Sequence, residues 1–287
     1  MAEPEPTPAV PEPTFITTAL RDVSGWLAAF DAREIPVQEI TAECLEEWRG
    51  NEDAADAHLL ADSLGGDPLM TLKLLRHVAA LRRGRDEAEA ETVTEALVML
   101  GITPFFRDFG PQPTLEQRLL KHADALDGLR QVLRRARRAA HFALGFAVHR
   151  GDHDAAVIYE AALLHDFAEM LLWVHAPAMA LAIRQRQQDE PGKRSIDAQR
   201  AQIHIELGEL QQALMKAWGL PDLLVQISDD HSSPSAKVRN VQLAIRLARH
   251  SAQGWDNPAL PDDVDEIAHL LNLGIEPTLS LLHDLDD

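Results

Sequence analysis

The sequence is poor in the residues that build disulfide-bonded, β-rich or membrane-spanning proteins. One cysteine, Cys44, occurs among 287 residues, so an internal disulfide is excluded and a reducing cytoplasm suits the chain. A single tyrosine, an aromatic content of 5% and the lack of alternating β-branched runs argue against a β-sandwich or barrel. Because no apolar run approaches about 18 residues, we expect no membrane span.

Basic residues are scarce relative to acidic ones. The chain has 27 Lys and Arg against 46 Asp and Glu, a formal net charge of -19. Such a surface repels phosphate backbones, which argues against nonspecific nucleic-acid binding, and it disfavours an anionic membrane surface. Hydrophobic residues make up 46% of the sequence, which is enough to bury the core of one large or two modest domains.

The sequence contains a succession of helical patterns behind a proline-rich start. Acidic residues alternate with five prolines in residues 1–15, which predicts a disordered tail. Beyond it, apolar residues recur at helical spacing, and Asp67-Pro68 supplies an N-cap acid and a first-turn proline for one helix. Other helices are expected at about 17–32, within 115–149, from the loop ending at 194 to 217, at 236–251, at 262–273 and from 277.

The most informative stretch is apolar and runs from Glu160 to Trp173, with His165 and Asp166 in its middle. We expect one continuous helix here, with His165 on its inward face and Glu169 one turn further on. Burying either member of the pair alone is costly, so each needs a partner. In one interpretation His165 is a core histidine and Asp166 pairs locally, which is the commoner situation. In the other, the two residues are metal ligands of a helical phosphohydrolase site.

Further motifs surround this pair in a specific order. His141 lies upstream on another apolar stretch, and the pair itself reads Leu163-Leu-His-Asp166. The flanking motifs are Gly66-Asp-Pro-Leu-Met70, Glu95-Ala-Leu-Val-Met-Leu-Gly101, His204-Ile-Glu-Leu-Gly208, Ala217-Trp-Gly-Leu-Pro221 and Asp230-His231. This ordered set resembles the HDOD family, the HD-related output domain of bacterial signalling proteins, over roughly residues 20 to 250.

The resemblance implies an all-α, multi-helix HD-like fold in which an N-terminal helical lobe packs on an HD-like helical lobe. In this chain it assigns residues 16–114 to the N-terminal lobe and 115–287 to the HD-like lobe with its C-terminal helices. A basic cluster, Arg130–Arg138, falls in the second lobe. We interpret the cluster as a solvated face that balances the acidic surface, with an anion or partner-protein patch as the alternative.

The resemblance also implies the remains of a metal site. Active HD phosphohydrolases hold a divalent cation with a first His, the His-Asp pair and a later Asp on a separate helix. The first three correspond here to His141, His165 and Asp166, whereas the fourth position falls on Ile245, which has no ligating atom. Glu169 stands where a lysine is common in active enzymes. No cofactor is expected beyond a divalent metal ion that the three remaining ligands could bind weakly.

Three other side chains are candidates to replace the lost ligand: Glu169, His204 and His231. We expect His204 and His231 to line the ligand cleft. Ser232-Ser-Pro234 follows His231, which departs from the Gly-Tyr-Pro signature of the HD-GYP phosphodiesterases.

The implied function is bacterial signal transduction without catalysis. The protein would act in the cytoplasm through signalling protein partners, or by sensing a small ligand or nucleotide in the degenerate HD cleft. The alternative is an active metal-dependent phosphohydrolase, a phosphodiesterase of the HD superfamily, and a third is a structural adaptor with an empty cleft. Neither nucleic acid nor a membrane is an expected partner.

Overall fold

The computed structural model describes residues 13–84, 89–190, 194–229 and 235–286, so most of the predicted tail lies outside it. These ranges contain helices and no strands, with an isolated bridge between Val37 and Thr114. The all-α prediction is confirmed. The elements are α1 (Val23–Asp31), α2 (Glu39–Arg49), the 3-10 helix η1 (Glu52–Ala54), α3 (Ala57–Leu64), α4 (Pro68–Arg82), α5 (Val93–Leu100), α6 (Ile102–Asp108), α7 (Leu115–Arg118), α8 (Ala123–Arg150), α9 (Ala155–Leu164), α10 (Phe167–His175), α11 (Pro177–Asp189), α12 (Ser195–Ile203), α13 (Leu207–Trp218), α14 (Asp222–Ile227), α15 (Ala236–His250), α16 (Leu260–Leu271) and α17 (Ile275–Asp286).

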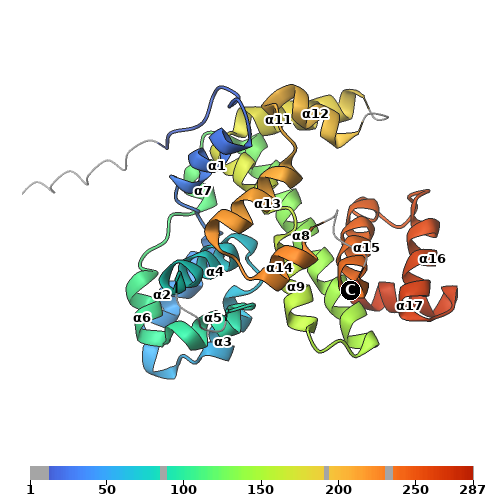
Figure 1. Cartoon of the computed structure of the whole chain (residues 1–287), viewed down its shortest axis with the longest axis horizontal. Helices are drawn as coiled ribbons and strands as arrows, with labels where there is room; N and C mark the ends of the chain where they lie inside the picture. Colours follow the sequence, from blue (N-terminus) through green and yellow to red (C-terminus); the bar gives the residue numbers. More distant parts are fainter. Residues whose placement is uncertain (1–12, 85–88, 191–193, 230–234, 287) are drawn as a thin grey trace, which may run out of the picture.

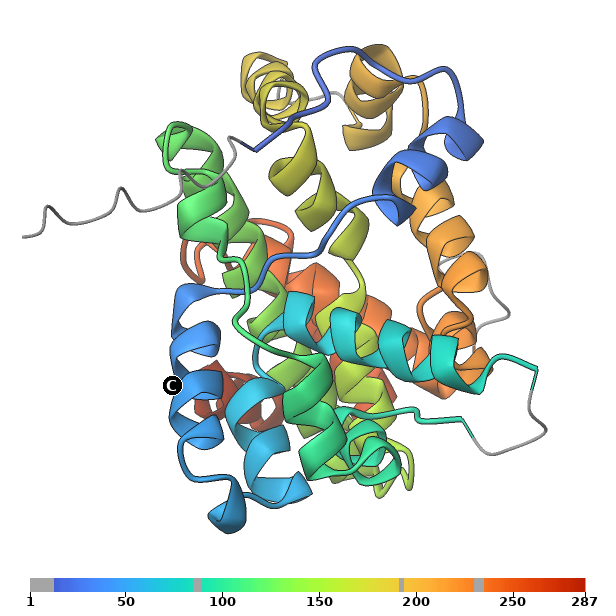
Figure 2. The ribbon, with the colours of Figure 1, turned by 90° about the vertical axis from the view of Figure 1, so that its left-hand side faces the viewer.

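The helices fall into spatial groups that follow the chain only in part. Helices α2 to α6 gather at one end of the molecule (Figures 1 and 2), where α4 contacts α8, α9 and α10. Helix α1 instead packs on α13, and Trp26 donates its indole N–H to the carbonyl of Ile203 at 3.0 Å. We propose residue 115, where α7 begins, as the boundary between the two lobes.

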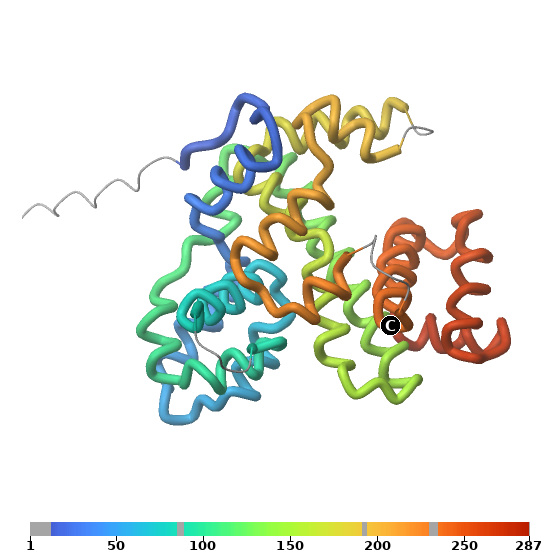
Figure 3. The backbone as a smooth tube through the Cα atoms, in the orientation of Figure 1, coloured from blue at the N-terminus to red at the C-terminus, as the bar shows by residue number. Residues whose placement is uncertain are grey.

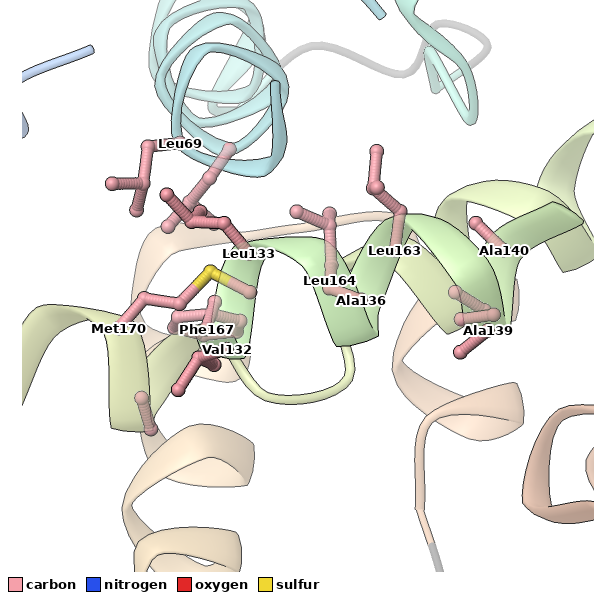
Figure 4. Close-up of a cluster of buried hydrophobic side chains, with 14 of the residues drawn as sticks. Leu69, Val132, Leu133, Ala136, Ala139, Ala140, Leu163, Leu164, Phe167 and Met170 are labelled. Atoms are coloured by element: carbon pink, nitrogen blue, oxygen red, sulfur yellow. The ribbon is translucent and has the colours of Figure 1, made fainter. Parts of the chain in front are cut away.

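Helix α8 is the central element of the fold. Its apolar face contacts α9, α10 and α15. Gly128 permits the approach of α10, because a Cβ atom built at this position would lie 2.4 Å from the ring of Trp173. Side chains from α4, α8, α9 and α10 form a cluster of buried hydrophobic residues (Figure 4), which fixes the segment that carries the His-Asp pair.

The last three helices form a separate group beside α8 and α9 (Figure 3). Arg138 on α8 reaches Asp286 at the end of α17, with 2.7 Å between Nε and Oδ1. Within this group, α15 makes the contacts with α8 and α9 on one side and with α16 on the other. The position of α15 matters below because it forms one wall of the candidate site.

Two of the predicted helices begin or end at other residues in the structure. The first begins at Val23 rather than near 17, because Asp22 caps it by accepting a hydrogen bond from Gly25 N at 2.9 Å. The predicted helix to 217 is divided at His204, whose φ of 65° ends α12, since a left-handed residue cannot continue a right-handed helix. The predicted start at Asp67-Pro68 is confirmed, with the Asp67 carboxylate accepting from two backbone N–H groups of the first turn of α4.

The apolar segment around the His-Asp pair belongs to two helices, α9 and α10. In the described ranges, no single helix combines the length and apolar character that crossing a bilayer requires. Ala155–His175 and Pro177–Asp189 meet the length and composition criteria only as a pair, and the angle between them is 118°.

Candidate functional site

His165 and Asp166 lie at a turn between two helices. Helix α9 ends at Leu164 and α10 begins at Phe167, so the predicted continuous helix is interrupted at the pair itself. Both flanking residues are buried, which anchors the turn on each side (Figure 4). The side chains of His165 and Asp166 are 10% and 12% exposed, and His165 Nδ1 lies 3.1 Å from Asp166 Oδ1.

Two arginines from other helices bind the Asp166 carboxylate. Arg135 of α8 donates to Oδ2 from Nη2 at 2.8 Å and from Nε at 3.2 Å. Arg249 of α15 donates to Oδ1 from Nη2 at 2.8 Å. Burial opposes ionisation of the carboxyl group, but the charges of Arg249 and Arg135 and the bond to His165 hold the pKa of Asp166 well below its usual range. Asp166 is therefore ionised, and guanidinium groups bind both of its oxygens.

Glu169 extends this network along α10. Arg135 Nη2 donates to Glu169 Oε2 at 2.8 Å, and the indole N–H of Trp173 donates to Oε1 at 3.3 Å. Burial would lower the pKa of Arg135, but the two carboxylates raise it above its ordinary value. We call Arg135, Asp166, Glu169 and Arg249 the Asp166 network. Glu169, which the sequence suggested as a substitute metal ligand, serves here as a partner of an arginine.

His141 does not join the Asp166 network. Its side chain is exposed on α8, and its ring centroid lies 6.1 Å from that of Tyr159. Within the described residues, no group of three or more His, Cys, Asp or Glu side chains is placed to hold a metal ion. Because the Asp166 oxygens already accept from arginines, the donor set that the described residues arrange does not fit the divalent metal implied by the resemblance.

A pocket of about 250 Å³ opens beside the pair. Ile245 forms part of its wall, at the place where the resemblance expected a fourth ligand. Arg249 is 47% exposed and donates to Asp166 from a single nitrogen, so among the described residues its other N–H groups are available to a ligand. Arg246 is held by Asp263 and Glu266, each at 2.7 Å. The lining residues are His165, Gln242, Ile245, Arg246 and Arg249, a set that suits a small anionic group.

Of the two other histidines predicted in the cleft, the one that the structure describes, His204, does not line this pocket. His204 is exposed at the corner between α12 and α13, and its Nδ1 lies 3.2 Å from the carbonyl oxygen of Leu20. It is absent from the pocket lining. His231 and its neighbour Asp230 lie outside the described residues.

The Arg130–Arg138 cluster is mostly directed inward, so its interpretation as a solvated face was wrong for three of its members. Arg137 donates to the carbonyl of Gly66 at 2.6 Å and to Gln38 at 2.8 Å. Arg138 binds Asp286, and Arg135 binds Asp166 and Glu169. Arg130 and Arg134 are the exposed members.

Sequence reasoning missed the two arginines that bind Asp166. Arg135 carried a signal, since it lies three residues after Val132 and four before Ala139, both of which are buried on α8. Arg249 lies one helical turn after Ile245 on α15, which places both at the same pocket. A basic residue on an apolar helix face calls for a buried acidic partner.

Comparison with known proteins places this geometry in a family. The family model of the HDOD domain matches residues 35–234. The MmoQ response regulator of Methylococcus capsulatus str. Bath is 21% identical, with a TM-score of 0.63 over 88% of this chain and 98% of that one. A virulence factor of Campylobacter jejuni subsp. jejuni is 14% identical, with a TM-score of 0.64 over 92% and 98%. No curated protein sequence matches significantly. The chain belongs to the HDOD domain family.

Proposed function

We propose that this HDOD protein is a non-catalytic component of bacterial signal transduction in the cytoplasm, which senses a small anion or nucleotide and acts on partner proteins. The observation that carries the proposal is the binding of both Asp166 oxygens by Arg135 and Arg249. A guanidinium group supplies positive charge, but it has no vacant coordination position at which water could be activated. A response regulator among the proteins of similar fold supports a signalling role.

The first prediction is that the protein does not hydrolyse phosphate esters at an enzymatic rate. Metal-stripped protein would be supplied with manganese, iron or magnesium, and turnover of cyclic dinucleotides, nucleotides and an aryl phosphate would be followed. We expect no turnover above the protein-free control. Turnover on the order of one per second, abolished by His165→Ala and by Asp166→Ala, would instead establish the alternative, a functioning phosphohydrolase.

The second prediction concerns the pocket beside α15. Arg249 has unused N–H groups there, so a phosphate-bearing ligand can bind it beside Asp166. We expect calorimetric titration with a panel of mononucleotides and cyclic dinucleotides to detect binding that Arg249→Gln weakens by at least about tenfold, since a hydrogen bond to a charged group contributes about 1.5–3 kcal/mol.

Arg239→Gln is the matched control for this titration. Arg239 lies on the same helix and is 46% exposed, with its nearest carboxylate oxygen 4.0 Å away on Glu266. It is absent from the pocket lining, so its removal changes the net charge equally without touching the site. Equal loss of affinity in both variants would mean that binding depends on overall charge, and no binding by any member of the panel would contradict the ligand-sensing part of the proposal.

A further inference from the structure

A second basic cluster lies where α1, α7 and α10 meet, away from the Asp166 network. It consists of Arg33, Arg118 and His175. Arg118 Nη2 lies 3.2 Å from His175 Nδ1, and Arg118 Nε donates to the carbonyl of Val174 at 2.9 Å. The ring of His175 packs against Phe30 of α1, with centroids 5.6 Å apart. Arg33 N donates to the carbonyl of Phe30 at 3.1 Å, and the charge of Arg33 acts on both His175 and Arg118. Three segments that are distant in the sequence therefore bring two guanidinium groups and an imidazole together.

Two donors in this cluster are buried without a hydrogen-bond partner. His175 is 1% exposed, and because its Nδ1 faces the Arg118 donor, the ring proton resides on Nε2. Nε2 is buried and has no partner among the described residues, and the same holds for Nε of Arg33. Buried N–H groups are nearly always satisfied in folded proteins, so two orphans in one cluster indicate that a bound species accepts from them.

No carboxylate of the described residues is ion-paired with this cluster, although the charge of Glu34 acts on Arg118 from a distance. In the described ranges neither Arg33 nor Arg118 forms an ion pair with a carboxylate, since their printed acceptors are backbone carbonyls and the His175 ring. The nearby carboxylate of Glu34 is 65% exposed and pairs with Lys73 at 3.4 Å. Burial, with the charges of Arg118 and Arg33, lowers the pKa of His175 to about 3, so the neutral ring adds no charge but still donates from Nε2.

The N-terminal segment restricts the size of any species bound here. Ile16 N donates to the carbonyl of His175 at 2.7 Å, and Arg118 Nη2 donates to the carbonyl of Thr14 at 3.2 Å. The ring of Phe15 lies against Arg118, 5.4 Å from its guanidinium carbon. A water molecule could satisfy the N–H groups but would leave the two guanidinium groups without an ion-pair partner, whereas a small anion satisfies both requirements.

We propose that Arg33, Arg118 and His175 form a binding site for a small monovalent inorganic anion, a halide, which accepts from Arg33 Nε and His175 Nε2. This site is independent of the pocket beside Asp166. The bound anion would join the ends of α1, α7 and α10 under the N-terminal segment, and it would stabilise the folded state in proportion to its occupancy.

The test compares thermal unfolding of the full chain in sodium chloride and in sodium gluconate at equal ionic strength, because gluconate is too large for a buried site. We expect the midpoint of thermal unfolding of the unmodified protein to be higher in chloride by roughly 3 °C. This is the shift expected when the chloride concentration is about ten times the Kd of the site. Arg33→Gln should abolish this difference. Arg21→Gln, which removes an equal charge from an exposed residue outside the cluster, should retain it.

Crystals soaked in sodium bromide then locate the anion directly by anomalous scattering. The proposal expects a bromide peak within hydrogen-bond distance of both Arg33 Nε and His175 Nε2. It is overturned if the chloride effect is missing from the unmodified protein or persists in Arg33→Gln. It is equally overturned if bromide occupies only surface positions and the orphan donors bind water.

Discussion

Replacing Asp166 by alanine should lower the free energy of unfolding by about 3 kcal/mol, because it leaves the charge of a buried arginine without its partner. Arg135 is 22% exposed and shares its guanidinium between Asp166 and Glu169. Arg249 is 47% exposed, so water can solvate its guanidinium group, and the loss of Asp166 costs less free energy at this arginine. Urea denaturation followed by circular dichroism measures the change, with an unaltered m-value confirming that only stability has shifted.

Glu46→Ala is the control for this substitution. Glu46 is 51% exposed and pairs with Arg49 at 3.2 Å one turn away on α2. A surface pair of this kind contributes at most about 1 kcal/mol. Equal effects of the two substitutions would show that the Asp166 network does not stabilise the fold.

The contribution of Asp166 to the free energy of unfolding should also depend on pH, and it should fall as the solution becomes more acidic. The pKa of Asp166 is lower in the folded state than in the unfolded chain, where it is near 4. Its contribution is therefore complete above about pH 4 and is lost as the pH falls through the folded-state pKa. The stability difference between the unmodified protein and Asp166→Asn should shrink below about pH 4, and a constant difference would contradict the assigned shift.

Glu160 should produce the opposite pH dependence, with stability that falls as the pH rises. This residue on α9 is 5% exposed. Its Oε1 accepts from Val93 N at 3.1 Å, and its Oε2 has no partner among the residues that the structure describes. Burial raises the pKa of Glu160 from 4.5 to about 8, and the charge of Glu95 adds to the rise against the lowering effect of the Val93 bond.

The free energy of unfolding falls with rising pH because the folded and unfolded states bind different numbers of protons. Between the unfolded and folded pKa values the folded protein retains a proton that the unfolded chain releases. The contribution of Glu160 is thus complete below about pH 4.5, declines up to about pH 8 and is constant above that value. With 1.36 kcal/mol for each pKa unit, the decline is on the order of a few kcal/mol.

Glu160→Gln isolates this effect, because glutamine keeps the acceptor for Val93 N and cannot ionise. We expect urea denaturation between pH 5 and pH 9 to show a flatter profile for this variant, which should be more stable than the unmodified protein at the alkaline end. Glu209→Gln, at an exposed position on α13, should follow the unmodified protein. If the profiles of all three proteins ran parallel, Glu160 would be ionised at neutral pH in the folded state.

The sequence by itself determined the helical class, several helix boundaries and the family. These features depend on residues three or four apart, or on a cap and the turn that it binds. Asp67 shows this, because its carboxylate binds the backbone of the two residues that follow Pro68. The ordered motifs around His165 and Asp166 predicted the HDOD family, and they placed Ile245 beside the pair, where it lines the pocket.

Only the tertiary structure decided what surrounds Asp166. Arg249 is 83 positions away and Arg135 is 31 positions away, so no local pattern predicts either contact. Packing of α8 and α15 against the turn brings the arginines to the carboxylate, and it leaves His141 beside Tyr159. His204 lies away from this pocket for the same reason, since its left-handed backbone turns the chain and directs the ring to Leu20. Charge pairing in this protein follows from how helices pack, which the spacing of charged residues along the chain does not encode.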